Sequence, residues 1–202
     1  MSENNRNKTI ALAEISILTA LIIVMAFTPI GYIKTAGLEI TLITIPVVVG
    51  AIILGPKAGL FLGTVFGLTS FIQAISGLSA FGAIMFQTSA VGCFVTAVPT
   101  RMLMGLIAGF AGSFLRKHIP SVSDFITGFI GALSNTVLFM SSLMAFYWHS
   151  DLIQGLVETM GTTSIPAFLF AFVGLNGIVE MICCTIISGA VCKALSKVKK
   201  LS

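Results

Sequence analysis

Four polar side chains stand inside long apolar stretches of this sequence: Arg101, Asn135, Asn176 and Glu180. At about 1.5 Å of rise per helical residue, three of them (Arg101, Asn135 and Glu180) lie about 15–18 Å from an end of their stretch. That depth is near the middle of a hydrocarbon core about 30 Å thick. Polar groups so deep in a membrane are costly and usually mark a binding or transport site. We therefore expect three helices to share a polar pocket.

The chemistry of these side chains favours a small anionic ligand with hydroxyl or amide groups. Arg101 carries a permanently charged fork of donors that suits a carboxylate. Asn135 and Asn176 both donate and accept, so they suit hydroxyl and amide groups. Glu180 is four residues after Asn176 on the same helix face, where it would orient Arg101 or the ligand.

A purely structural interpretation stays open beside this one. Arg101 and Glu180 would then form a buried ion pair that locks two helices, while the asparagines bond backbone carbonyls. Gln73 and Gln87, near the outer ends of two apolar stretches, are candidates for the pocket entrance. A role at a helix interface fits each glutamine equally well.

Other chemistries find no support in the sequence. Catalysis is not expected, because neither a GxSxG nor an HExxH motif occurs and His118 and His149 flank the apolar stretches. The four cysteines form no CxxC pair, so we expect free thiols and no metal site. The segment Gly50–Lys57 lacks the Lys-Ser/Thr ending of a phosphate-binding loop, so neither a nucleotide site nor another cofactor is expected. No basic patch with interleaved aromatic residues suggests a nucleic acid partner.

Composition places these residues in a lipid bilayer. Of 202 residues, 56% are hydrophobic and 9% are charged, and the mean hydropathy is +1.07. Apolar runs without a two-residue alternation predict an all-α membrane protein rather than a barrel. We expect a single domain over 1–202 with six spans, near 10–29, 40–54, 58–75, 91–115, 124–147 and 165–192.

Charge predicts the orientation of these spans. Assigning alternate loops to one side gathers nearly all lysines and arginines there, which by the positive-inside rule makes both termini cytoplasmic. The expected location is the cell membrane. The outer loops at 31–39, 76–89 and 149–164 are longer than the inner connections, and we expect them to cover or bind something.

Small residues form ridges on three of the predicted spans. Gly59, Gly63 and Gly67 recur every four residues, and Gly105 and Gly109 do so in the next span. Such ridges let helices approach closely. The first span presents a further small-residue face made of Ala13, Ser16 and Ala20, which would pack inside this protein or against another subunit.

The six-span pattern and several segments together resemble the substrate-binding (S) components of energy-coupling factor (ECF) vitamin transporters, most closely the pantothenate-type members. The segments that carry the resemblance are 27–32 (FTPIGY), 45–50 (IPVVVG), 54–59 (LGPKAG), 66–70 (FGLTS) and 98–102 (VPTRM), with Asn176, Gly177 and Glu180. The likeness covers nearly the whole chain.

The resemblance implies a subunit that captures a vitamin from outside and works with a membrane scaffold (T) subunit and two ABC-type ATPases. Members are thought to topple in the bilayer to deliver the vitamin, and several can share one ATPase module. The family's small-residue motif in the first span contacts the scaffold, which assigns that contact here to Ser16 and Ala20. Pantothenate has a carboxylate, an amide and hydroxyls, which suits Arg101 and the asparagines.

The sequence leaves other ligands and other classes of protein open. The ligand would be another water-soluble vitamin, or the chain would be a stand-alone secondary transporter driven by an ion gradient, with Glu180 as the titrating group. A third class is a structural membrane protein in which Arg101 and Glu180 only pair.

Overall fold

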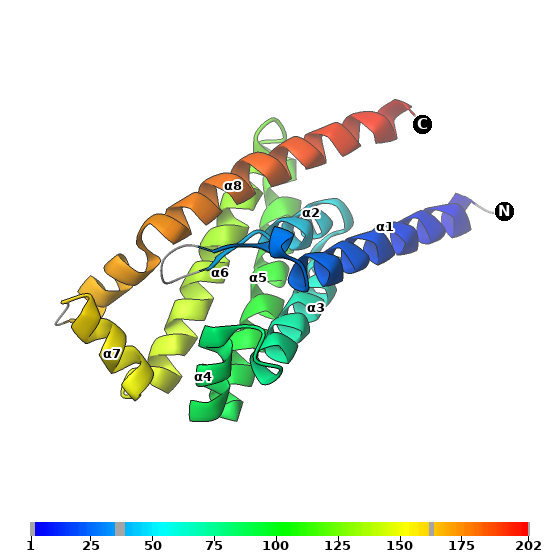
Figure 1. Cartoon of the computed structure of the whole chain (residues 1–202). Helices are drawn as coiled ribbons and strands as arrows, with labels where there is room; N and C mark the ends of the chain where they lie inside the picture. Colours follow the sequence, from blue (N-terminus) through cyan, green and yellow to red (C-terminus); the bar gives the residue numbers. More distant parts are fainter. Residues whose placement is uncertain (1–2, 35–38, 162–163, 202) are drawn as a thin grey trace.

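The computed structural model describes residues 3–34, 39–161 and 164–201 of the chain. They form a bundle of helices with a small β-hairpin laid across it (Figure 1). The elements are α1 (Glu3–Ala26), the 3₁₀-helix η1 (Pro29–Gly31), β1 (Tyr32–Lys34), β2 (Glu39–Thr41), α2 (Thr44–Leu54), α3 (Pro56–Ile75), α4 (Ala80–Thr88), α5 (Ala90–His118), α6 (Ser123–Tyr147), α7 (Asp151–Thr159) and α8 (Ile165–Leu201).

Within the described residues, five helices are long and apolar enough to cross a membrane. The qualifying segments are Lys8–Ala26, Pro56–Ile75, Ala90–His118, Ser123–Tyr147 and Gly177–Lys197. The first four match the spans predicted near 10–29, 58–75, 91–115 and 124–147, and the fifth overlaps the later part of the span predicted near 165–192. The chain is therefore a multi-pass helical membrane protein.

The segment predicted as a second span, 40–54, differs from the expectation. Its first residues belong to strand β2, and α2 has only 11 residues, which is about 16 Å of helix. Nearly all of α2 is buried, including Thr44 and the run from Pro46 to Ile52. Because protein rather than lipid surrounds it, this segment does not need the length of a lipid-exposed helix.

Two of the predicted outer loops contain short helices. Ser79 begins α4 by accepting a hydrogen bond from the backbone N–H of Gly82 at 3.2 Å. Ser150 does the same for α7 with Ile153 at 3.4 Å. Side-chain oxygens at these positions satisfy donors that the first turn leaves free. The third outer loop, 31–39, contributes the antiparallel hairpin, in which Ile33 pairs with Ile40.

Helices α3 and α5 pack closely through the predicted glycine ridges. A methyl group on Gly59 would overlap the carbonyl oxygen of Gly105, and one on Gly63 would overlap that of Arg101. Only glycine allows backbones to approach this closely. The ridge thus fixes the part of α5 that carries Arg101.

Helix α8 bends at Gly174, whose φ of 22° and ψ of −128° are not helical. The predicted span 165–192 therefore begins before a bend and continues beyond the predicted end. On the N-terminal side of the bend, Phe168 and Phe172 stack with ring centroids 5.1 Å apart. The first turns of α1 and the last turns of α8 lie at the same end of the bundle (Figure 1).

Candidate functional site

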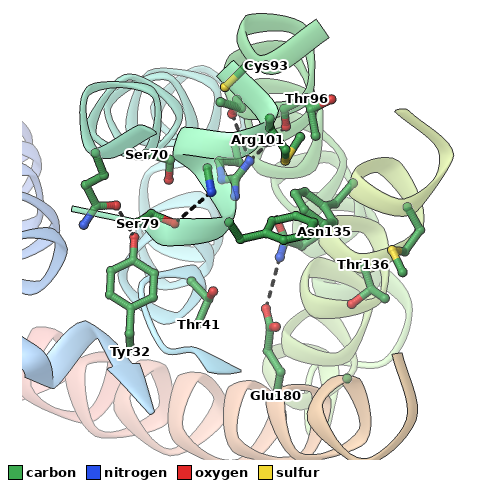
Figure 2. A pocket seen from close by; sticks show the side chains of 18 of the residues that line it. Tyr32, Thr41, Ser70, Ser79, Cys93, Thr96, Arg101, Asn135, Thr136 and Glu180 are labelled. Atoms are coloured by element: carbon green, nitrogen blue, oxygen red, sulfur yellow. Dashed lines mark hydrogen bonds between the residues drawn. The ribbon is translucent and has the colours of Figure 1, made fainter. Parts of the chain in front are cut away.

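A cavity of about 420 Å³ lies between the helices, beneath the hairpin and α4. Figure 2 shows side chains from several elements pointing into it. Its polar lining residues are Tyr32, Thr41, Ser70, Gln73, Ser79, Cys93, Thr96, Arg101, Asn135, Thr136 and Glu180. Apolar lining residues include Phe81, Met85, Phe139, Met140 and Phe172. Three helices do bring their mid-membrane polar residues to one pocket, as the sequence predicts.

Arg101 is held at the cavity wall by its own helix. Its Nη1 donates to the carbonyl oxygens of Thr96 at 2.9 Å and Ala97 at 3.1 Å. These two bonds, to carbonyls one turn earlier in α5, fix the direction of the guanidinium.

The other side of the guanidinium has no hydrogen-bond partner within the described part of the chain. Nε is buried without one, and both hydrogen bonds of the guanidinium use Nη1 rather than Nη2. Nε and Nη2 form the fork that binds a carboxylate with two parallel hydrogen bonds. Thr96 Oγ1, also in the cavity lining, is buried without a partner in the same region. This wall therefore offers unused donors to an anion.

Aromatic faces flank the arginine. Its Cζ lies 4.7 Å from the ring centroid of Phe66 and 5.7 Å from that of Phe139. Each such contact stabilises a cation by about 0.5–2 kcal/mol. Arg101 is thus stabilised as a cation without a carboxylate partner.

Glu180 rises from α8 on another wall and is fixed through one oxygen. Thr44 Oγ1 donates to Oε1 at 3.0 Å, and Asn135 Nδ2 donates to the same oxygen at 3.1 Å. Figure 2 shows the bond from Asn135. The side chain is 9% exposed and lines the cavity. Asn135 therefore both lines the cavity and holds the carboxylate of Glu180 in place.

Arg101 and Glu180 do not form an ion pair. No nitrogen of Arg101 lies within 4.0 Å of a carboxylate oxygen of Glu180, and the salt bridge recorded among the described residues joins Arg116 to Asp124 instead. The locking pair considered from the sequence is therefore absent from this structure. The two side chains therefore line one cavity without a direct contact between them.

The glutamines and asparagines considered as site residues have different places. Gln73 lines the cavity, but its amide is engaged by protein: Tyr32 donates to Oε1 at 2.7 Å, and Nε2 donates to the carbonyl of Ala26. It ties the hairpin to α3. Gln87 is exposed on α4 and is not a lining residue. Asn176 belongs to α8, but its side chain lies outside the described residues.

The predicted partner face is exposed. Ala13, Ser16 and Ala20 all lie on the open side of α1, where Ser16 Oγ donates to the carbonyl of Leu12 at 2.8 Å. No other helix of the described chain covers these three residues, so the face does not pack internally.

Several residues that line the cavity or contact Arg101 or Glu180 carry no mark in the sequence. Thr44 and Thr96 sit among many apolar neighbours, and threonines of that kind are common in membrane helices. Tyr32, one of two tyrosines, precedes a short loop and offers a weak signal. Phe66 and Phe139 are two of sixteen phenylalanines. Only their position relative to Arg101 distinguishes them.

The fold and this cavity define an integral membrane protein with a partly polar cavity inside its helical bundle. A model of the family described as "ECF transporter, substrate-specific component" matches residues 11–191. The chain belongs to that family, and it is a transport protein.

Two curated relatives are similar over most of the chain. The pantothenic acid transporter PanT of Lactococcus lactis subsp. cremoris is 30% identical over 174 residues, which cover 80% of each chain. The pantothenate transporter PanT of Leuconostoc mesenteroides subsp. mesenteroides is 31% identical over 193 residues, covering 93% of this chain and 92% of the relative.

Proposed function

We propose that this chain is the vitamin-binding subunit of an ATP-driven ECF uptake transporter and that its ligand is pantothenate. It would capture the vitamin from outside and deliver it inward together with a scaffold subunit and two ATPases. The family assignment supports vitamin uptake, and the names of both relatives support the choice of pantothenate.

One observation carries the assignment of the site: Arg101 lines the cavity with donors that have no partner, and among the described residues no carboxylate lies within 4.0 Å of its nitrogens. The fork of Nε and Nη2 would bind the pantothenate carboxylate. Asn135 and Glu180 would bond the hydroxyl and amide groups, and Asn176 is proposed to do the same. The rings of Phe139 and Phe172 would contact the apolar carbons.

We further propose one domain that crosses the membrane six times with both termini in the cytoplasm. The common end of α1 and α8 supports an even number of crossings. Besides the five long helices, the hairpin and α2 together would make one further crossing, between α1 and α3 in the chain, where other helices surround α2. The proposed entrance is on the side of the hairpin, α4 and α7.

Binding by the purified protein tests the proposal. Arg101→Ala should weaken pantothenate binding by about 100-fold, because hydrogen-bonded charge pairs in desolvated sites contribute several kcal/mol. Isothermal titration calorimetry in detergent measures the change. Arg116→Ala is the matched control, since Arg116 is 39% exposed and pairs with Asp124 away from the cavity lining.

The outcomes separate the parts of the proposal. Unchanged affinity in Arg101→Ala would remove Arg101 from the site. Tight binding of a different vitamin in a panel would keep the transport role and replace the ligand. A secondary transporter would instead be indicated if cellular uptake continued after ATP depletion but stopped when the proton gradient collapsed.

A further inference from the structure

Glu180 has an unused oxygen in the cavity wall. Both hydrogen bonds to its carboxylate, from Thr44 and Asn135, go to Oε1. Oε2 receives no hydrogen bond and no cation from the residues that the structure describes. Glu180 lines the cavity, so this oxygen can accept from a ligand without breaking a hydrogen bond inside the protein. The carboxylate is therefore positioned to accept a hydrogen bond from a ligand.

The arginine and the carboxylate give the cavity two chemically opposite parts. Arg101 presents donors and a positive charge from α5, while Glu180 presents an acceptor and a negative charge from α8. Since the two do not pair, each remains available to a different end of a ligand. Thr44 and Asn135 prevent Glu180 from turning toward Arg101, because both hold its Oε1.

We propose that Glu180 is the specificity-determining residue of the site and restricts it to ligands with a single anionic end. The acid end of the ligand lies at Arg101, and the opposite end must carry neutral donors such as hydroxyls, which bond Oε2. A phosphate at that opposite end is rejected, because it places a second negative charge beside a buried carboxylate. This rule rests on the proposed function of the site.

The test compares pantothenate with its phosphate ester at the primary hydroxyl. We expect the purified wild-type chain to bind the ester on the order of 100-fold more weakly than pantothenate, the size of a like-charge penalty. In Glu180→Gln this difference should shrink to less than about 10-fold. The amide oxygen of glutamine still accepts from Thr44 and Asn135, while its N–H₂ group donates to the phosphate.

A matched control and a second ligand separate charge from folding and from size. Glu158→Gln removes an exposed carboxylate on α7 that is not in the cavity lining, and it should keep the wild-type discrimination. An uncharged ester of the same hydroxyl, tested on the wild-type chain alone, should bind better than the phosphate ester. This second comparison holds even where Glu180→Gln fails to fold.

Three results would overturn the inference. Equal discrimination by the wild type and Glu180→Gln would show that Glu180 does not set it, while pantothenate binding and the proposed function stand. Equal rejection of the charged and uncharged esters would show that size decides. A wild-type chain that binds no pantothenate would overturn the proposed function, and the charge rule with it.

Discussion

At the scale of residues, each charged side chain of the site is hydrogen-bonded by the protein through one of its polar atoms and keeps another polar atom without a partner. Nη1 of Arg101 is bound to two carbonyls while Nε has no partner. Glu180 is bound through Oε1 in the same manner. Hydrogen bonds to charged groups contribute about 1.5–3 kcal/mol each, so the bonded atom fixes the direction of the unpartnered atom. The site is therefore ordered before a ligand arrives, which lowers the entropy cost of binding.

Substitution of Thr44 is the simplest test of whether these hydrogen bonds fix the direction of Glu180. Thr44→Val keeps the shape of the side chain and removes its hydrogen bond to Glu180 in a fully buried place. We expect the free energy of unfolding to fall by about 1.5–3 kcal/mol and pantothenate affinity to fall as Glu180 loses its fixed direction. Equilibrium denaturation in detergent and calorimetry measure the two effects.

Thr64→Val is the control for that substitution. Thr64 Oγ1 bonds only the carbonyl of Leu60 in its own helix, at 2.8 Å, and such bonds add little to helix stability. The control should change the free energy of unfolding by less than about 1 kcal/mol. Equal effects of the two substitutions would contradict the supporting role of Thr44.

At the scale of elements, the contact between α3 and α5 determines where Arg101 lies. Gly63 lies directly against the backbone carbonyl of Arg101. Gly63→Ala must push the two helices apart, and overpacking of this kind typically costs about 1–3 kcal/mol. We expect a lower melting temperature and weaker pantothenate binding, because the shift occurs at the arginine itself.

Gly155→Ala provides the comparison. Nothing lies within 4 Å of a methyl group at Gly155 in α7, and alanine favours helix by up to about 1 kcal/mol over glycine. This variant should melt at the same temperature as the wild type or slightly higher. If Gly63→Ala binds pantothenate as tightly as Gly155→Ala does, the α3–α5 contact does not position Arg101.

How much of these elements the sequence predicts depends on what surrounds them. The ranges 58–75, 91–115 and 124–147 agree with the structure to within three residues at each end, because lipid requires long apolar helices. This rule does not apply to the short α2, which is surrounded by protein, or to the hairpin, which lies across the bundle. The bend at Gly174 escapes it too, because a single glycine in an apolar run gives no sign of its backbone angles.

In the site, too, the sequence signals some residues and gives no sign of the contacts that others make. Arg101, Asn135 and Glu180 could be predicted because a polar group at membrane depth needs an explanation. Gln73 was expected at the entrance, and the structure adds that its amide is already bonded by Tyr32 and Ala26. Those partners are far away in sequence, so no local pattern points to them.

At the scale of the whole molecule, α1 is the candidate surface for a partner. Only 17% of the most apolar stretch of this helix is buried within the protein, the lowest share among the five candidate spans. Ala20→Trp should reduce vitamin uptake by cells at least about 10-fold, because a bulky ring prevents close helix contact. Pantothenate binding by the isolated subunit should be unchanged.

Leu21→Trp is the matched control on the same helix. Leu21 is 44% exposed and lies about 100° around the helix axis from Ala20, so its substitution should spare uptake. Normal uptake by Ala20→Trp, or loss of uptake in both variants, would show that the small-residue face is not the coupling surface.

The single tryptophan of the chain gives the cavity an optical reporter. Trp148 makes an edge contact with Phe168, at 6.0 Å between ring centroids, and Phe168 stacks on Phe172 in the cavity lining. A ligand that moves Phe172 changes the surroundings of the indole through one intervening ring. Intrinsic fluorescence, excited where tryptophan alone absorbs, therefore follows occupancy in real time in the unlabelled protein.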